Sequence, residues 1–450
     1  MNQNESLPLY IQLTETYVPA WGCGGPVRLM YDYAQWLSSG FQVMVHTTDA
    51  HHDFTRIPVR CEIIGGVSVY RHKFFFAALA RRSAFVISPT MLIQAAKQIY
   101  RARRPVIVHF SLFRGPVPIT AMLLKLLFRK RVTLVHSAFG SLYYKRAIHR
   151  QIYDALFMKS FVRLVDLRLV QNDHEGEAYN RICLENGANG QSQIVLFPLS
   201  LDGIPPNPTR FTDSGKNHAA VLELRRTLGV PEDALVFVFL GRLHPSKGIL
   251  RMIDAFLEFS QSCSRETLLL VVGHDFGFQR NIEQYILSKG IESKVRIINN
   301  VYETRFDYYF LADVFLGFPT IFEETMLASI EAMACGTPIV VSREADAPFV
   351  EEARAGRVID FDPSAAARAM ADVVENLPMF QANARRVAAS CFDGAAASKN
   401  LRALFCKAIS GNLSSETPTE TGAVGRQGLP RNISQHERLV SSRSESRDPA

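Results

Sequence analysis

Short apolar runs alternate with amphipathic helical stretches in both halves of the chain, and this alternation constrains the fold more than any other feature. Residues 7–13 form an apolar run, a glycine-rich loop follows, residues 27–38 place apolar side chains on one helical face, and residues 41–47 form a second run. Strand, loop, helix and strand in this order make a βαβ unit of a parallel sheet. The pattern starts again at residues 235–240, so the sequence predicts a second sheet of the same kind.

A polar, proline-rich stretch at residues 201–216 separates the two series. A chain of 450 residues is also too long for one hydrophobic core. We therefore predict an α/β protein with two doubly wound, Rossmann-like domains, over residues 1–205 and 206–385, and a disordered polar tail over residues 411–450. Ligands of such sheets bind at the carboxyl ends of the strands, so two facing domains predict a cleft between them.

The composition narrows the compartment and the kind of site. Seven cysteines are scattered without a CxxC pair, which favours neither a disulfide framework nor a zinc site. The chain contains no run of 18 apolar residues, and its N-terminus has no basic segment of the kind that opens a secretory signal. We expect a cytoplasmic protein without a membrane-spanning helix.

Basic residues are concentrated in the N-terminal half. Between Glu62 and Asp154 there is no acidic residue in 91 positions, and the same stretch contains 16 lysines and arginines, from Arg71 to Arg150. Such a block predicts a positive surface that faces a membrane leaflet, a phosphate-bearing substrate or nucleic acid, or one that is only solvated. Residues 119–131 are amphipathic as well as basic, which favours an anionic membrane surface. No nucleic-acid-binding motif accompanies the block, so no nucleic-acid partner is predicted.

The segment at residues 318–341 (FPTIFEETMLASIEAMACGTPIVV) is the most informative for chemistry. An apolar strand ends here, a short loop carries Glu323, and a helix is predicted to follow, with Glu331 two turns along it. Free amides in the first helical turn and the positive helix end attract an anion such as a diphosphate. We expect Glu323 to contact sugar hydroxyls and Glu331 to accept hydrogen bonds from a ribose; the alternative is two surface glutamates on an ordinary helix. The free amides belong to Thr325, Met326 and Leu327.

A basic loop, GRLHPSKG, follows the first strand of the second series directly. Arg242 can bind phosphate oxygens through two N–H groups, and Lys247 adds a compact charge to the same group. Gly241 and Gly248 allow the backbone to turn tightly. Taken alone, such a loop is equally typical of an ordinary surface.

A glycine pair, Gly24 and Gly25, stands at the start of the first predicted helix. Glycines there let a ligand approach the backbone and leave amides that can face a phosphate across the cleft. A plain tight turn explains the pair equally well.

Together, these motifs resemble a family 4 glycosyltransferase of the two-Rossmann-domain (GT-B) type. Glu323 and Glu331 are similar to the E-x7-E motif of that family, and Glu331 opens its E-A-M-A-C-G-T-P-I-V run. The loop at residues 241–248 is similar to its G-R-L-x-x-x-K-G loop, and the glycine pair to its N-terminal pair. The resemblance extends over about residues 9–405, with the same order and spacing.

The resemblance implies a transfer that retains the anomeric configuration and requires no metal or other cofactor. It implies that Arg242 and Lys247 bind the donor diphosphate and that Glu331 binds the nucleotide ribose. It also implies that Glu323 lies at the donor sugar. Arg242, Lys247 and Glu323 are therefore the predicted catalytic residues. A C-terminal helical segment, residues 386–410, is expected to pack back toward the first domain.

The sequence departs from the family pattern at three places. Residues 324–326 are Glu-Thr-Met where the family has G-F-G, so donor-sugar selectivity does not carry over. Residues 198–202 are PLSLD where the family has P-N-G-x-D. The His-Gly pair of the family has no clear counterpart: His109 and His136 are candidates for lining the cleft, and a place in the core is the alternative.

The expected reaction uses electrostatics, because charge collects on the departing diphosphate while the sugar becomes oxocarbenium-like. The departing phosphate oxygen can take the acceptor proton, so no dedicated base is needed. We expect the acceptor to be a lipid-linked saccharide on the inner membrane face, in lipopolysaccharide or exopolysaccharide biosynthesis. Removing Lys247 or Glu331 is expected to abolish transfer without unfolding the protein. The alternatives are a nucleotide-sugar epimerase or phosphorylase on the same scaffold and, outside enzymes, a basic nucleic-acid-binding protein.

Overall fold

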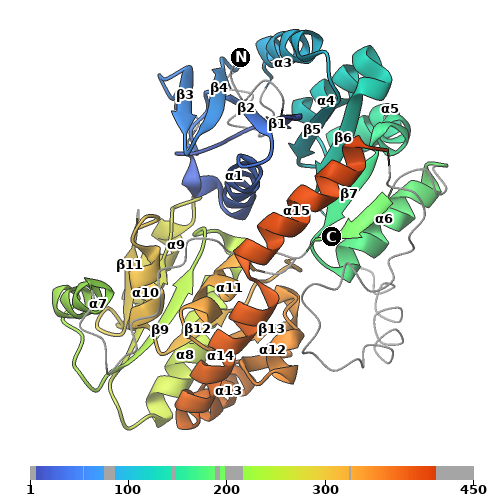
Figure 1. Cartoon of the computed structure of the whole chain (residues 1–450). Helices are drawn as coiled ribbons and strands as arrows, with labels where there is room; N and C mark the ends of the chain where they lie inside the picture. Colours follow the sequence, from blue (N-terminus) through green and yellow to red (C-terminus); the bar gives the residue numbers. More distant parts are fainter. Residues whose placement is uncertain are drawn as a thin grey trace.

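The computed structural model contains two α/β domains, and the N-terminal one is at the top of Figure 1. The structure describes residues 7–53, 55–75, 87–143, 148–187, 193–197, 216–299, 301–323 and 326–411. The predicted linker up to residue 215, the PLSLD stretch at 198–202 and all of the predicted tail beyond residue 411 lie outside these ranges.

The N-terminal domain is built on an eight-stranded sheet in the order β3-β4-β2-β1-β5-β6-β7-β8. All neighbours pair in parallel except β3 and β4, which form an antiparallel hairpin. The strands are β1 (Leu9–Leu13), β2 (Gln42–Thr48), β3 (Cys61–Ile64), β4 (Val67–His72), β5 (Val106–Ser111), β6 (Val132–Ser137), β7 (Leu167–Val170) and β8 (Gln193–Leu196). The helices are α1 (Gly25–Leu37), α3 (Pro89–Ala102), α4 (Pro116–Phe128), α5 (Ile148–Leu164) and α6 (Asp173–Glu185).

The C-terminal domain is built on six parallel strands in the order β11-β10-β9-β12-β13-β14. The strands are β9 (Leu235–Leu240), β10 (Thr267–Val272), β11 (Val295–Ile298), β12 (Val314–Gly317), β13 (Ile339–Ser342) and β14 (Gly356–Ile359). The helices are α7 (Lys216–Thr227), α8 (Ile249–Ser262), α9 (Gln279–Lys289), α10 (Arg305–Leu311), α11 (Leu327–Ala334), α12 (Phe349–Glu352), α13 (Pro363–Glu375) and α14 (Leu377–Cys391). The prediction of two doubly wound sheets is confirmed.

Unbroken apolar strands explain why both sheets are covered on both faces. Every residue of β1 and β5 is buried, and in β9 only Leu240 is partly exposed. Parallel strands between two helical layers favour such runs over alternation. Each sheet therefore has one apolar cluster on each side: in the N-terminal domain Phe110 belongs to one and Tyr33 to the other.

The strand order reverses at one point in each sheet. In the N-terminal sheet this point lies between β1 and β5, and in the C-terminal sheet it lies between β9 and β12. The loops that leave the carboxyl ends of neighbouring strands at such a point diverge and leave a crevice. The two crevices face each other in this chain, so the fold itself positions a site between the domains.

The last described helix, α15 (Gly394–Ile409), returns from the C-terminal domain to the N-terminal one, as Figure 1 shows in orange-red. Its Leu401 and Phe405 are fully buried in the N-terminal core, where the Phe405 ring stacks on Tyr10 at 5.8 Å between centroids. The preceding α14 packs instead on the C-terminal domain, through Ala384 and Val387. The predicted boundary at residue 386 therefore falls inside α14, and the chain changes domain only after Cys391.

Candidate active site

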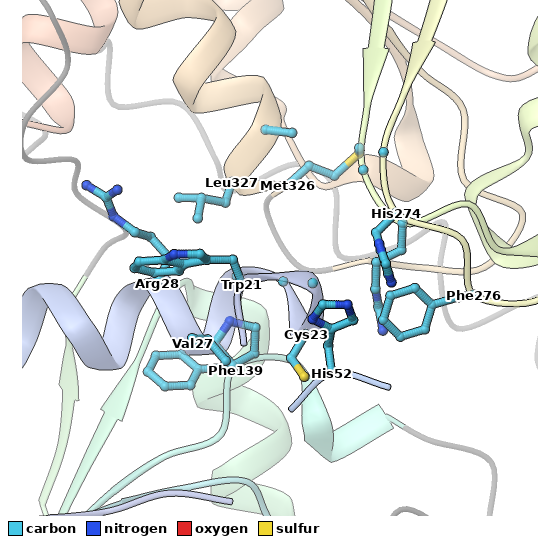
Figure 2. A pocket seen from close by; sticks show the side chains of 18 of the residues that line it. Trp21, Cys23, Val27, Arg28, His52, Phe139, His274, Phe276, Met326 and Leu327 are labelled. Atoms are coloured by element: carbon cyan, nitrogen blue, oxygen red, sulfur yellow. The ribbon is translucent and has the colours of Figure 1, made fainter. Parts of the chain in front are cut away.

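A cavity of about 900 Å³ lies between the two domains at the carboxyl ends of the strands. The N-terminal wall includes the loops after β1, β2 and β5 and the start of α1. The C-terminal wall includes the loops after β9, β10 and β12 and the starts of α10 and α11. Figure 2 shows Trp21, Cys23 and His52 of the first wall facing Met326 and Leu327 of the second. The cavity thus occupies the place that the strand order predicts.

The basic loop after β9 is held against the loop after β12 by backbone geometry. A short 3-10 turn, η5 (Pro245–Lys247), ends at Gly248, whose φ is 65°. A Cβ at this position would lie 1.8 Å from the carbonyl oxygen of Phe318, so only glycine fits. The close approach brings the end of β12 next to Lys247.

Lys247 and Glu323 form an ion pair inside the cavity. The Lys247 Nζ donates to Oε2 of Glu323 at 2.6 Å, and the two side chains are only 13% and 15% exposed. Burial lowers the pKa of Lys247, an effect that the Glu323 charge opposes and the Arg242 charge strengthens. The guanidinium of Arg242 lies 5.4 Å from the centre of the Phe276 ring at the same wall. The structure therefore brings together all three predicted catalytic residues.

Glu331 also lines the cavity, but protein groups already occupy its carboxylate. Arg305 donates from Nε and Nη2 to Oε1 at 3.0 and 2.9 Å, and the Tyr309 hydroxyl donates to Oε2 at 3.2 Å. Glu331 and Arg305 are each 4% exposed. A carboxylate has about four acceptor positions, so a ribose hydroxyl can still bind here. Removing Glu331 would leave a buried guanidinium unpaired, which changes the expectation that the fold survives its loss.

The helix that carries Glu331 begins slightly later than predicted. α11 starts at Leu327 with Met326 at its N-cap, where no side chain caps the helix. The first amides of a helix have no intrahelical partner, so the positive end of α11 faces the cavity that Met326 and Leu327 line. Thr325 lies outside the described residues.

The glycine pair of the N-terminal domain meets the C-terminal domain across the cleft. Gly24 has φ 88°, in the region that favours glycine, and precedes α1. A Cβ on Gly24 would lie 3.9 Å from Nε of Arg242, and one on Gly25 would lie 3.8 Å from the Leu327 side chain. The pair therefore contacts both the basic loop and the start of α11.

An aromatic stack that the sequence did not reveal bridges the two domains. The Trp21 and Tyr302 rings stack at 4.4 Å between centroids and 10° between planes, and the Arg305 guanidinium lies 4.2 Å from the centre of the Tyr302 ring. Trp21 belongs to η2 (Trp21–Cys23) ahead of α1, whereas Tyr302 and Arg305 precede or begin α10. Since Arg305 also binds Glu331, the stack connects the predicted ribose site to the other domain.

His109 and His136 do not line the cavity. Both are fully buried in the sheet of the N-terminal domain. His109 shares hydrogen bonds with the Tyr10 and Ser137 hydroxyls at 2.8 and 2.9 Å, and His136 contacts the Tyr179 hydroxyl and the carbonyl oxygen of Leu112. Burial lowers the pKa of each to about 3. The structure therefore supports the alternative, in which both histidines belong to the core. The reason is that both lie within strands rather than in the loops that follow them.

Further titratable groups of the cavity wall were missed. Glu15 follows β1 directly, and burial raises its pKa to about 8. His52 faces His274 of the other domain, with ring centroids 4.1 Å apart, and burial together with His274 lowers the pKa of His52 to about 4. The position after a strand was the one available signal for Glu15; nothing in the sequence pairs His52 with His274.

Part of the basic block of the N-terminal half is neutralised by ion pairs within the fold. Arg71 pairs with Glu62, Arg114 with Asp154, and Lys125 with Asp166, so three of the charges are neutralised by nearby carboxylates. Exposed basic residues remain on and beside α3 and α4: Lys97, Arg101, Arg103, Arg129 and Lys130. In the described part of the chain, no helix has both the length and the apolar character to cross a membrane, and no group of three His, Cys, Asp or Glu side chains is arranged to hold a metal ion.

Two Rossmann-like domains that face each other across a cleft, with a basic loop and a helix N-terminus on one wall, define the GT-B class. Residues 234–376 match the family described as Glycosyl transferases group 1. The resemblance to a family 4, GT-B glycosyltransferase is thereby confirmed.

The curated relatives are named as glycosyltransferases, and the solved structures share the fold. The D-inositol 3-phosphate glycosyltransferase of Streptomyces coelicolor is 28% identical over 245 residues, which are 51% of this chain and 53% of the relative. That of Catenulispora acidiphila is 30% identical over 46% of this chain and 51% of the relative, so the chain spans about half the length of the curated relatives it matches. The fold is similar to sucrose-phosphate synthase from Thermosynechococcus elongatus (TM-score 0.64, 18% identity, 90% of this chain and 100% of the other). It is equally similar to Anabaena HepE in complex with UDP-glucose (TM-score 0.64, 16% identity, 89% and 100%).

Proposed function

We propose that this protein is a retaining glycosyltransferase that moves a sugar from a nucleotide-diphosphate donor to a saccharide or polyol acceptor. The observation that carries the proposal is the cluster of Arg242, Lys247 and Glu323 beside the N-terminal end of α11. Two cations and a helix end in one partly enclosed wall are suited to a diphosphate, and Lys247 is held in place by Glu323 at 2.6 Å.

The proposed transfer breaks the bond between the anomeric carbon and the diphosphate oxygen and forms a bond from that carbon to an acceptor oxygen on the same face. The acceptor proton passes to the departing phosphate oxygen, so atoms and charge balance without another reactant. Arg242, Lys247 and the α11 amides stabilise the negative charge that collects on the diphosphate. Because these groups supply the positive charge, we expect transfer to persist in EDTA.

Donor binding is tested directly by thermal unfolding. A ligand present at 100 times its Kd and bound only by the folded state adds about 2.7 kcal/mol of stability. UDP-, GDP- and ADP-sugars are compared in the wild type and in Arg242→Ala. We expect one nucleotide class to raise the Tm of the wild type alone. Equal behaviour of both proteins with every donor would contradict the placement of the diphosphate.

The products formed from the donor distinguish a glycosyltransferase from an epimerase or a phosphorylase. Product analysis of the selected donor should show hydrolysis to the free sugar with retained configuration, and transfer when an acceptor is added. An isomerised sugar nucleotide with no acceptor would indicate an epimerase, and release that depends on inorganic phosphate would indicate a phosphorylase.

We further propose that the acceptor is a lipid-linked saccharide reached at an anionic membrane surface. Helices α3, α4 and α5 lie together in the N-terminal domain (Figure 1) and expose large apolar side chains next to the basic residues of α3 and α4. Apolar side chains flanked by cations favour the surface of an anionic leaflet. The exposed apolar residues are Ile93, Tyr100, Leu123, Leu126, Leu127, Ile148, Ile152 and Leu156.

The membrane proposal is tested by sedimentation with vesicles. Wild-type protein should sediment with phosphatidylglycerol vesicles and much less with phosphatidylcholine vesicles. Leu126→Glu combined with Leu127→Glu should abolish this preference, whereas Leu287→Glu, at an equally exposed position of α9, should not. Equal sedimentation with both lipids would favour a soluble acceptor, such as the D-inositol 3-phosphate in the names of the relatives.

A further inference from the structure

Glu15 lies on the N-terminal wall of the cavity. It follows β1 at the strand-order reversal of the N-terminal sheet and lines the cavity together with Thr14, Thr16 and Ser111. Arg242, Lys247 and Glu331 of the proposed donor site lie on the opposite wall. The Cys23 thiol lies within electrostatic range of both Glu15 and Arg242, so this carboxyl and the proposed diphosphate site face the same part of the cavity.

The Glu15 carboxyl has no hydrogen-bond or ion-pair partner among the described residues. Arg114, whose charge acts on the nearby Tyr153, donates through Nε and Nη2 to the two oxygens of Asp154 at 2.7 and 2.8 Å. The Tyr153 hydroxyl donates to the carbonyl oxygen of Gly115 at 3.3 Å rather than to Glu15. Glu15 is half-buried, and its carboxyl lines the cavity. A carboxyl in a cavity wall that has a perturbed pKa and no protein partner indicates a ligand.

The fold positions this carboxyl against the start of α4. A Cβ on Gly115 would lie 2.8 Å from Oε1 of Glu15, and Gly115 has φ 141°, so glycine is required at this close approach. A helix start would ordinarily offer amides to a carboxylate. Here Pro116 and Pro118 occupy two of the first three positions and have no N–H.

The charge state of Glu15 follows from its surroundings. Burial raises its pKa to about 8, so the carboxyl is mainly protonated at neutral pH. The charge of Glu15 acts on the Cys23 thiol and the Tyr153 hydroxyl; Arg242 also acts on Cys23, and Arg114 and Asp154 also act on Tyr153. A protonated carboxyl can donate one hydrogen bond and accept others, which suits a hydroxyl-bearing ligand.

We propose that the Glu15 carboxyl binds a hydroxyl of the acceptor and thereby holds the attacking oxygen toward the donor sugar. The inference rests on the proposed transfer and names the acceptor wall of the same site. Glu15 keeps its own proton throughout, because the proton of the attacking hydroxyl still passes to the departing phosphate. The acceptor class is therefore one with a hydroxyl next to the attacking one, as in a saccharide or a polyol.

Steady-state kinetics of Glu15 variants test this assignment. The donor is the sugar nucleotide selected by thermal unfolding. The acceptor probes are D-inositol 3-phosphate in solution and a polyprenyl-diphosphate-linked saccharide in vesicles. Each probe is followed by its own glycosylation and by its competition with water during donor hydrolysis, so affinity is measured even for a poor acceptor. Glu177→Ala, an exposed glutamate of α6, is the matched control.

Glu15→Ala should raise the acceptor KM or inhibition constant about tenfold, the effect of one lost hydrogen bond of ~1.4 kcal/mol, and should leave donor KM and donor hydrolysis unchanged. Glu15→Gln keeps a neutral donor and acceptor and should retain most of the affinity. Wild-type acceptor affinity should fall above pH 8 as Glu15 ionises, and that of Glu15→Gln should not.

Unchanged acceptor affinity in Glu15→Ala, or an equal loss in donor hydrolysis, would overturn the assignment while the proposed function stands. Wild-type protein that neither binds nor hydrolyses any sugar nucleotide would instead refute the proposed function, and the role of Glu15 with it.

Discussion

The two walls of the cleft differ in how their ionisable side chains are paired. On the C-terminal wall two ion pairs are formed before any substrate is present: Lys247 with Glu323 at 2.6 Å and Arg305 with Glu331 at 2.9 Å. On the N-terminal wall Glu15 has no partner in the described part of the chain, and burial keeps it protonated. A wall that holds a diphosphate gains from charges fixed in advance. A wall that binds a neutral hydroxyl compound needs a polar side chain whose hydrogen bonds are not already made within the protein.

The largest effect is expected from removing Glu331. Loss of one partner of a buried ion pair typically destabilises a protein by about 3–5 kcal/mol, because the other charge stays buried. Urea unfolding of Glu331→Ala should show this loss, and the double variant Glu331→Ala with Arg305→Met should recover part of it. A single variant as stable as the wild type would show that the pairing on the C-terminal wall is not a structural requirement.

Lys247→Ala is expected to affect the reaction more than the fold. Removing one preorganised charge at the site where negative charge develops costs a factor of about 100–1,000 in turnover. The Tm should change little, because the Glu323 carboxylate that remains can reach solvent in the cavity. Lys289→Ala, at an exposed position of α9, serves as the control. Transfer at the wild-type rate would remove Lys247 from the site.

Acid should weaken the N-terminal domain first. His46, His109 and His136 are fully buried there with pKa values lowered to about 3, whereas His244 and His274 of the other domain retain some exposure. The unfolded chain binds a proton at each buried histidine near pH 6.5 and the folded chain does not, so stability is lost as pH falls below 6.5. The loss is about 1.4 kcal/mol per histidine for each pH unit.

This acid sensitivity is measured as Tm between pH 7.5 and 5. His46→Gln should reduce the slope of Tm against pH, and His149→Gln, at an exposed position, should leave it unchanged. A wild-type Tm that stays constant down to pH 5 would contradict the burial of these histidines in their neutral form.

The sequence was sufficient to predict those features of the fold and the site that depend on local patterns. The apolar runs of β1, β5 and β9 and the motifs around Arg242 and Glu331 predict the two sheets and the donor wall, because each depends on residues adjacent in the chain. The β3–β4 hairpin was missed although Gly65-Gly66 between two alternating runs is a turn signal. The pairing of Arg305 with Glu331 could not be predicted, since the residues meet only when α10 and α11 pack together. The positions of His109 and His136 were ambiguous for a related reason. The sequence of an apolar strand does not indicate whether a histidine within it faces the core or a ligand.

The smallest of these effects is expected from the Trp21–Tyr302 stack, which connects the two walls. Aromatic pairs contribute about 0.5–1.5 kcal/mol beyond their buried area, so Trp21→Ala should raise the donor KM about two- to tenfold. Domain stability should be nearly unchanged, because the stack lies between the domains rather than within either core. Trp21→Phe keeps an aromatic face and should restore most of the affinity. If instead Trp21→Ala altered acceptor affinity alone, the stack would belong with Glu15 to the acceptor wall, and the division of the cleft would have to be redrawn at Trp21.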